Sequence, residues 1–328
     1  YAAIGVAAPL ILVLLRFVQG LAIGGQWGGA MLLVTESAPA DQRGWYGAYA
    51  QAGAPVGVIL ANLAFIGVSS SMSEEAFMDW GWRLPFIASI VLIGISMYVQ
   101  LRLEDTEAFK ALQESQDGEA SDQPIAASPV VEAIRKYPKR IMLAAGAFLS
   151  VQVTFYILIA FIIAYGVTAP ELALSRDTML TAVLIAAAIM VPSQFYFSGL
   201  SDRVGRKQIY RWGAILTGLW GFALFPLINT GEPLMIVIAV TLGLTFLGMQ
   251  YGPQAAYFTE LFTTEVRYSG ASLGYQIGAI LGGALAPTIA VLLWNELGIF
   301  YVSVYILVAA ILTLLSLSAL EETKGRTL

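Results

Sequence analysis

Residues that could do covalent chemistry are scarce in this sequence, which contains no histidine and no cysteine. Their absence excludes disulfides, thiolate nucleophiles, zinc sites built from cysteine and histidine, and a Ser-His-Asp triad. The stretch GASLG at 270–274 fits the pattern of a nucleophile elbow, but it lies in an apolar helical run without a histidine as base. No Gly-x4-Gly-Lys-Ser/Thr phosphate loop occurs. We therefore expect neither an enzyme nor a cofactor nor a bound metal.

The residues that could do chemistry are polar side chains inside long apolar runs, where they cost free energy. Arg16, Gln19 and Gln26 fall within about 80° of one another around a helix, so they form one stripe. An unpaired guanidinium costs at least ~2.5–3.5 kcal/mol at the centre of a membrane-spanning helix. We therefore expect Arg16 to attract a carboxylate, either of a substrate or of a buried partner.

Two further stripes of polar residues occur later in the chain. Gln250, Gln254 and Tyr257 lie within about 60° on one helical face, and Gln152 and Tyr156 lie about 40° apart on another. Such stripes either face a substrate path or hydrogen-bond to neighbouring helices. Hydrogen bonds between membrane helices average only ~0.6 kcal/mol but are common. Both interpretations stay open at this point.

A third group consists of charged residues between the apolar runs. Glu36 precedes Arg43 by seven residues, so this pair brackets a loop and could join two helix ends. Glu260 and Arg267 repeat that spacing. An aspartate such as Asp202 can cap a neighbouring helix, where the dipole favours it by ~0.3–1 kcal/mol at exposed sites. The alternative is that these charges only orient the loops during membrane insertion. The basic residues that follow Asp202 closely are Arg203, Arg206 and Lys207.

The elements that must position these residues are membrane spans. The 328 residues are 58% hydrophobic and only 12% charged, whereas a soluble domain carries about 25% charged residues. The net charge of −5 argues against nucleic acid as a partner. Crossing a bilayer takes about 20 apolar residues. Nine such runs occur, at 8–36, 47–69, 84–101, 141–166, 178–198, 209–228, 233–258, 269–294 and 299–319.

The connections between the runs indicate an orientation. One connection, 102–140, is long and polar, which predicts a solvated linker, and its end at 129–140 predicts a short helix on the membrane surface. Fourteen of the 17 Lys and Arg residues lie in the set of loops that contains this linker and the C-terminus, and two lie in the opposite loops. The positive-inside rule therefore makes the linker and the C-terminus cytoplasmic and puts Tyr1 outside.

The first span repeats in the seventh. A shift of 224 residues gives nine identities in a 35-residue window, so one repeat contains six spans of the same orientation. The second copy begins near residue 140, so we expect three further spans before Tyr1. The expected organisation is a partial N-terminal bundle at 1–101, a cytoplasmic linker at 102–140 and a six-helix bundle at 141–328. The matched residues are Pro9, Leu10, Val13, Gly24, Gln26, Gly28, Thr35, Glu36 and Arg43 with Pro233, Leu234, Val237, Gly248, Gln250, Gly252, Thr259, Glu260 and Arg267.

A series of short motifs covers essentially the whole chain. They are RFVQG at 16–20, GGQWGG at 24–29, TESAP at 35–39, WGWRLPF at 80–86, LEDTEAF at 103–109, GLSDRVGRK at 199–207, FTELF at 258–262, RYSG at 267–270 and GYQ at 274–276. In their order and spacing, these motifs resemble the major facilitator superfamily, and within it the bacterial metabolite:proton symporter family. One departure is Gln26, where that family commonly has a glutamate, so this position cannot carry a proton.

The resemblance implies an all-α membrane protein with the major facilitator fold, containing nine of an expected twelve transmembrane helices. In that fold the first, fourth and seventh spans line a central cavity, so the three stripes would face the substrate. The charged residues would form a cytoplasmic gate that is closed in the outward-facing state. The expected substrate-binding residues are Arg16, Gln19, Gln26, Gln152, Tyr156, Gln250, Gln254 and Tyr257, and the expected gate residues are Glu36, Arg43, Asp202, Arg203, Arg206, Lys207, Glu260 and Arg267.

The expected function is secondary active transport by alternating access, as proton-coupled symport of a small organic acid. Dicarboxylates, keto acids, shikimate-like acids and aromatic acids all fit the resemblance and Arg16. The alternatives are a zwitterionic osmolyte as the substrate, a uniporter or channel-like facilitator, and a membrane sensor that does not transport. The expected partners are the lipid bilayer, an anionic small molecule and protons, in a monomeric protein of the bacterial cytoplasmic membrane.

Overall fold

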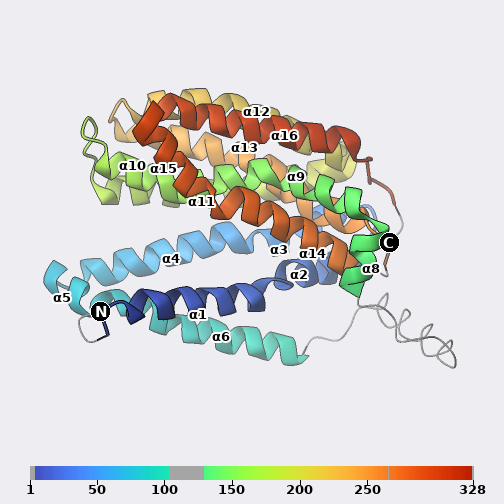
Figure 1. Cartoon of the computed structure of the whole chain (residues 1–328), viewed down its shortest axis with the longest axis horizontal. Coiled ribbons are helices and arrows are strands. Elements are labelled where there is room, and N and C mark those ends of the chain that lie inside the picture. The colour runs from blue at the N-terminus through green and yellow to red at the C-terminus, as the bar shows by residue number, and fades with distance from the viewer. Residues whose placement is uncertain (1–3, 103–128, 265, 327–328) are drawn as a thin grey trace.

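Helices make up the regular structure of this chain. The computed structural model describes residues 4–102, 129–264 and 266–326 (Figure 1), and no strand occurs among them. Nine helical segments in these residues are long and apolar enough to cross a membrane. The nine predicted spans and the all-α fold class are therefore confirmed. Residues 103–128 of the predicted linker, with the motif at 103–109, lie outside the described residues.

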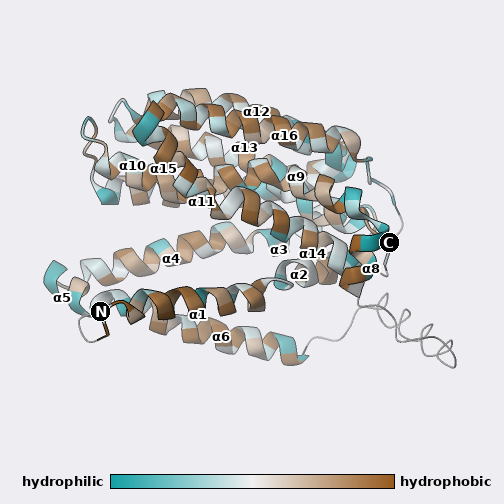
Figure 2. Cartoon of the chain, in the orientation of Figure 1, coloured by the Kyte–Doolittle hydropathy of each residue, from teal (hydrophilic) through white to brown (hydrophobic). Residues whose placement is uncertain are grey.

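The first three spans and their connector form a group in the lower part of Figure 1. Their elements are α1 (Ala7–Ile23) and α2 (Gln26–Glu36), α3 (Arg43–Gln51) and α4 (Gly53–Ser70), the short connector α5 (Glu74–Asp79), and a 3-10 turn (Gly81–Arg83) that leads into α6 (Leu84–Arg102). Within this group α1 and α6 have no buried residue, although both are strongly apolar (Figure 2). The exposed apolar surface is therefore concentrated in this part of the described chain.

The remaining six spans pack together in the upper part of Figure 1. The elements are α8 (Pro129–Lys136), α9 (Pro138–Tyr156) with a π turn (Ile157–Phe161) and α10 (Ile162–Thr168), α11 (Arg176–Val204), α12 (Arg206–Ile228), α13 (Pro233–Glu260), α14 (Arg267–Gly278) with a π turn (Ala279–Ala284) and α15 (Ala286–Leu297), and α16 (Ile299–Ala319). Phe148, Tyr210 and Phe258 are fully buried in their core.

The ends of the helices follow the sequence repeat. The helix α2 ends at Glu36 and α13 ends at Glu260, while α3 begins at Arg43 and α14 begins at Arg267. Both pairs of positions are 224 residues apart, which is the repeat distance. The two copies therefore form the same helix–loop–helix unit at this point. The division into bundles at 1–101 and 141–328 stays a prediction.

The two groups of spans meet mainly at one end of the molecule. There α2 and α3 of the first group contact α11, α13 and α14 of the second, and α4 also contacts α11. Towards the opposite end the ribbons of α1, α4 and α6 diverge from those of α10 and α15 (Figure 1). The contacts that matter for function are therefore concentrated at the end that carries α2, α3 and α14.

The helix predicted at the end of the linker is present as α8. Its Ala133 is fully buried, and α8 packs against α9 and α14. Val130, Val131 and Ile134 are exposed apolar residues on the same helix. The placement of this helix on a membrane surface stays a prediction.

Candidate functional site

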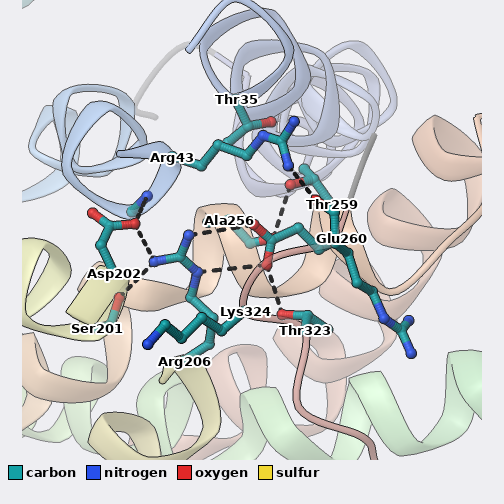
Figure 3. A network of polar contacts seen from close by, with 12 residues as sticks. Thr35, Arg43, Ser201, Asp202, Arg206, Ala256, Thr259, Glu260, Thr323 and Lys324 are labelled. Atoms are coloured by element: carbon teal, nitrogen blue, oxygen red, sulfur yellow. Dashed lines mark hydrogen bonds and ion pairs between the residues drawn. The ribbon is translucent and has the colours of Figure 1, made fainter. Parts of the chain in front are cut away.

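Charged side chains gather near the ends of α2, α3, α11, α12, α13 and α14 (Figure 3). Arg206, the first residue of α12, is at the centre, and its side chain is 1% exposed. It forms ion pairs with Asp202 on α11 and with Glu260 on α13, the latter at 3.3 Å, and its Nη1 donates to Ser201 at 3.1 Å. A buried charge without a partner is strongly destabilising. Arg206 therefore neutralises two carboxylates that could not be buried alone.

Asp202 also connects parts of the chain that are far apart in sequence. Its carboxylate accepts hydrogen bonds from the backbone N–H groups of Gly44 and Trp45, each at 2.9 Å. These groups lie in the first turn of α3, so Asp202 caps that helix as the sequence predicts. A Cβ atom on Gly44 would lie 2.5 Å from Arg206 Nη1 and 2.6 Å from the Ser198 carbonyl. The cap therefore requires glycine at this position.

A second contact across the two groups joins Arg267 of α14 to Glu36 of α2. Arg267 Nη1 donates to Glu36 Oε1 at 2.9 Å, and the side chains are only 4% and 9% exposed. The predicted pairing of Glu260 with Arg267 is therefore wrong in the described residues, because Glu260 pairs with Arg206 instead. The spacing of seven residues identifies the two ends of a loop correctly. In the fold, however, Arg267 at the end of this loop contacts Glu36 in the other group of helices.

Arg43 is the counterpart of Arg267 in the first repeat, and it too bonds outside its own copy. Its Nη1 donates to the backbone carbonyl of Arg326 at 2.6 Å. The predicted pairing of Arg43 with Glu36 stays a prediction. Its Nε atom is buried and has no hydrogen-bond partner among the described residues. Arg43 thus links α3 to the end of the chain.

The C-terminal segment, residues 320–326, was not predicted to belong to the site. Its Glu322 carboxylate accepts from the backbone N–H groups of Arg206 at 3.0 Å and Lys207 at 3.1 Å, which caps α12. Thr323, which is fully buried, donates to Glu260 at 2.6 Å. A signal was present in the sequence, because LEET at 320–323 repeats LEDT at 103–106, and each follows the last span of its half.

The other two predicted gate residues contribute mainly to this terminal segment. Lys207 Nζ donates to the Leu320 carbonyl at 2.5 Å, and the Arg203 carbonyl accepts from Lys324 at 2.5 Å. The Arg203 side chain lines an open groove of about 710 Å³ between α3 and α11, together with Asp41. All eight predicted gate residues therefore lie at one end of the molecule. Some join the two groups of helices, and the others hold the terminal segment at 320–326.

The first polar stripe lies on an exposed surface of the first span. Arg16 Nη1 donates to Gln19 Oε1 at 3.0 Å, and both side chains are exposed. Among the described residues Arg16 forms no ion pair. Gln26 is exposed as well, but it follows an interruption of the span at Gly24 and Gly25. The exposed stripe is therefore divided between two helices, with Arg16 and Gln19 on α1 and Gln26 on α2.

The other stripes divide into two kinds of environment. Gln152 is 7% exposed and shares a hydrogen bond with Tyr275 on α14, while the neighbouring Tyr156 is 38% exposed. Gln250 is fully buried and donates to Thr217 of α12 at 2.7 Å.

Gln254 and Tyr257 also bond within the second group of helices. Gln254 is fully buried and donates to the hydroxyl of Tyr210 on α12, and Tyr257 donates to the Glu321 carbonyl at 3.0 Å. In this conformation, Gln250 and Gln254 of the seventh-span stripe thus contact α12, and Tyr257 contacts the terminal segment, all within the second group. Substrate binding by these residues stays a prediction.

The fold and the site together define a class of protein: a multi-pass helical membrane protein built on a repeat, with a buried charge cluster that joins its two parts at one end. The sequence model of the Major Facilitator Superfamily matches residues 1–272, which is most of the chain. The chain belongs to the Major Facilitator Superfamily, and it is a membrane transporter of that type.

Named relatives agree with this assignment. The inner membrane metabolite transport protein YhjE of Escherichia coli (strain K12) is 37% identical over 337 residues, which cover 100% of this chain and 74% of the relative. The shikimate transporter of the same organism is 33% identical over 308 residues, which cover 92% of this chain and 69% of that protein.

A solved structure gives the fold independently. The proton:xylose symporter XylE, bound to 6-bromo-6-deoxy-D-glucose, superposes with a TM-score of 0.68 at 16% sequence identity. The match covers 91% of this chain and 68% of that chain. At this identity the likeness establishes the major facilitator fold alone.

Proposed function

We propose that this protein is a proton-coupled symporter of a small organic acid that works by alternating access as a monomer in the bacterial cytoplasmic membrane. Its two moving bodies are the bundles at 1–101 and 141–328, joined by the cytoplasmic linker. The charged end is the cytoplasmic end, in agreement with the positive-inside count. The structure then corresponds to an outward-facing state with a closed cytoplasmic gate.

The observation that carries this proposal is the set of charged contacts that join the two bodies, among the described residues, at the end where α2, α3 and α14 lie. Glu36 with Arg267, and Asp202 with the first turn of α3, hold the helix ends together. Charges buried in such contacts can separate only if water replaces each partner. A contact of this kind is therefore either closed and dry or open and wet, which is the behaviour of a two-state gate.

The surface around Arg16 supports an acidic substrate. The guanidinium is held by Gln19 and has no carboxylate partner among the described residues, so it can bind a carboxylate from outside the chain. The similarity to a protein named as a shikimate transporter supports a carboxylic acid of that size. Since Gln26 cannot titrate, the coupling proton must bind at another residue.

The test is counterflow by the full-length gene product in proteoliposomes. Labelled shikimate, 2-oxoglutarate, succinate and 4-hydroxybenzoate are offered separately, with a pH-sensitive dye enclosed in the vesicles. We expect counterflow of at least one acid, acidification of the lumen when the same acid is added to vesicles that contain none, and at least a tenfold weaker apparent affinity in Arg16→Gln. The matched control is Arg83→Gln, because Arg83 is also an exposed arginine but lies at the start of a different span, directly before α6.

Other outcomes would replace the proposal with a named alternative. Exchange of proline or glycine betaine but of no acid would make the protein an osmolyte transporter. Exchange without a proton signal would make it a uniporter. Substrate binding without any exchange would make it a sensor, and an unchanged affinity in Arg16→Gln would remove Arg16 from the binding site.

A further inference from the structure

A short helix at the charged end exposes apolar side chains beside basic ones. The helix α8 lies where α9 and α14 begin (Figure 1), packs against both, and buries Ala133 fully. Val130, Val131 and Ile134, which we call the apolar face, fall within about 100° of one another around the helix. They are 42%, 54% and 51% exposed, so the packing of α8 against the described chain leaves them uncovered.

The sequence makes α8 a separate helix rather than the first turns of a span. Tyr137 has non-helical backbone angles (φ −129°, ψ 39°), and Pro138 follows it as the first residue of α9. Proline suits the first turn of a helix and disfavours helical geometry in the residue before it. The ring of Tyr137 packs edge-on against that of Phe262, with centroids 6.3 Å apart. The chain therefore changes direction at the start of α9, and α8 is held there.

Three exposed cations, which we call the basic set, lie beside the apolar face. Arg135 is about 40° from Val131 around α8. Lys136 is on the other side of the same helix, and Lys139 is in the first turn of α9. Lys136 pairs with Glu132 at 2.5 Å, but exposed pairs of this kind contribute little to stability. Arg135 and Lys139 form no ion pair with any described residue.

The neighbouring Arg140 differs from the basic set because the protein itself binds its charge. Its guanidinium donates to the Leu261 carbonyl at 2.7 Å and pairs with Glu321 at 2.7 Å. Its side chain is only 30% exposed. Contacts within the described chain therefore account for Arg140, whereas they leave Lys139, one residue earlier, open to a ligand.

Exposed apolar side chains next to exposed cations fit a ligand that is anionic at one end and apolar behind it. An acidic soluble protein or a nucleic acid offers negative charge without a long apolar chain, whereas a phospholipid with a net negative headgroup offers both. Basic amphipathic helices bind such lipids at the membrane surface. Each Lys or Arg near an anionic membrane surface strengthens binding about fivefold. The count of basic residues in the loops places this end at the cytoplasmic leaflet.

We propose that α8 and the first turn of α9 form a binding site for an anionic phospholipid of the cytoplasmic leaflet. The basic set contacts the headgroup phosphate, and the apolar face contacts the upper part of an acyl chain. The site requires that the charged end of the molecule lies at the membrane surface. It involves no transported substrate, so its test does not depend on the proposed transport activity.

The test measures the contact between α8 and lipids of two kinds. The chain has no cysteine, so Val131→Cys introduces a single cysteine into it for labelling with bimane. The full-length protein is placed in phosphatidylcholine vesicles that contain a small, equal fraction of phosphatidylglycerol or phosphatidylcholine with a nitroxide on the acyl chain near the headgroup. We expect phosphatidylglycerol to quench the bimane at least fivefold more strongly. In Arg135→Gln/Lys136→Gln/Lys139→Gln this quenching ratio should fall close to one.

Matched variants separate a site from general attraction between charges. Arg83→Gln/Arg176→Gln/Arg211→Gln removes the same number of exposed cations elsewhere and should leave the quenching ratio unchanged. Lys139→Gln alone should lower the ratio at least twofold. Arg140→Gln should leave it unchanged, because that guanidinium is bound by the protein. Replacing the cations of the basic set by the other basic residue, Lys for Arg and Arg for Lys, should preserve the ratio.

Three results would overturn the proposal. Equal quenching by the two lipids in the parent protein would show that α8 touches the bilayer without selecting an anionic lipid. Loss of the ratio in both triple variants would reduce the effect to the net charge of the protein. Quenching by neither lipid would show that another occupant covers α8, such as the linker at 103–128, which contains seven Asp and Glu residues and one Lys.

Discussion

Two sets of buried polar side chains in this protein differ in what they join: one set joins the two halves of the repeat, and the other joins helices of the same half. At the charged end, Glu36 and Arg267 join one half to the other. Between α12 and α13, Gln250 and Gln254 join two helices of the same half. In the alternating access that we propose, the first kind of contact breaks in every cycle and the second kind stays in place.

The contact between the halves is charged and the contacts within one half are neutral amides, and this difference has a physical reason. A charged contact that opens at the membrane surface exposes both partners to water, so the separated charges are hydrated. A contact between helices deep in one bundle is never wetted, and there a neutral amide avoids the large cost of burying a charge. In the proposed cycle, the charged contact between Glu36 and Arg267 lies at the surface that opens. The ion pair between Arg206 and Glu260 and the buried amides between α12 and α13 lie within one half and stay closed.

The largest effect is expected from Arg206→Met. This change leaves the carboxylates of Asp202 and Glu260 buried without their cation, and removing one partner of a buried ion pair costs ~3–5 kcal/mol. We expect loss of about 99% or more of uptake and a large decrease in Tm of the purified full-length protein. Arg211→Met, an exposed arginine of the same helix, should change neither quantity appreciably. Equal, small effects of both changes would contradict the claim that Arg206 stabilises the buried charge cluster.

The next largest effect is expected from exchanging the charges of Glu36 and Arg267. Each single reversal places two like charges in a buried contact, so we expect a loss of uptake of about tenfold or more. The double change, Glu36→Arg with Arg267→Glu, should recover a substantial part of that uptake. The comparison pair is Glu260→Arg with Arg267→Glu, which should not recover, because these residues are not partners. Rescue in the comparison pair alone would restore the pairing predicted from spacing.

A smaller effect is expected from Thr323→Val in the C-terminal segment. The change removes the hydrogen bond to Glu260, and a hydrogen bond to a charged group contributes ~1.5–3 kcal/mol. We expect the closed gate to be destabilised, so that in full-length protein in inside-out vesicles a cysteine introduced at the fully buried Thr35 is alkylated by N-ethylmaleimide about tenfold faster. Thr230→Val, at an exposed turn, is the control. An unchanged rate would show that the terminal segment lies against the gate without holding it.

The smallest effect is expected from Gln250→Leu and Gln254→Leu. Because each amide bonds to α12 within one half, we expect a cost of about 1 kcal/mol or less in stability and a KM within about threefold of the wild type. An increase in KM of tenfold or more with unchanged Tm would instead support the prediction that these residues bind the substrate.

Much of the fold could be predicted from the sequence because the length of an apolar run alone identifies a membrane span. An apolar run of sufficient length must cross the bilayer as a helix, so nine runs predict nine spans. The repeat also aligned Glu36 with Glu260 and Arg43 with Arg267, which the helix ends match. The cap formed by Asp202 could be expected because a lone carboxylate near several helix ends finds free N–H groups.

The partners of the charged residues could not be predicted in the same way. The spacing along the chain predicted a pair between Glu260 and Arg267. In the fold, Arg267 pairs with Glu36 of the other copy and Glu260 pairs with Arg206. Helical periodicity placed Gln250 and Gln254 on one face but did not say which helix lies opposite. The segment around Thr323 does have an equivalent, because LEET at 320–323 repeats LEDT at 103–106 after the last span of the other half. The repeat at a shift of 224 residues did not align these two segments, so it did not identify them.

The central claim is that the contacts between the halves at the charged end break during transport. The most direct measurement is the distance between spin labels on cysteines at Asp41 and Lys139, two exposed positions on opposite halves at that end, in full-length protein in lipid. A second pair at Lys139 and Arg211, both in the second half, is the reference. We predict that a transported acid at low pH adds a population with a longer distance for the first pair and leaves the reference pair unchanged. A single, constant distance for the first pair during active uptake would contradict the account.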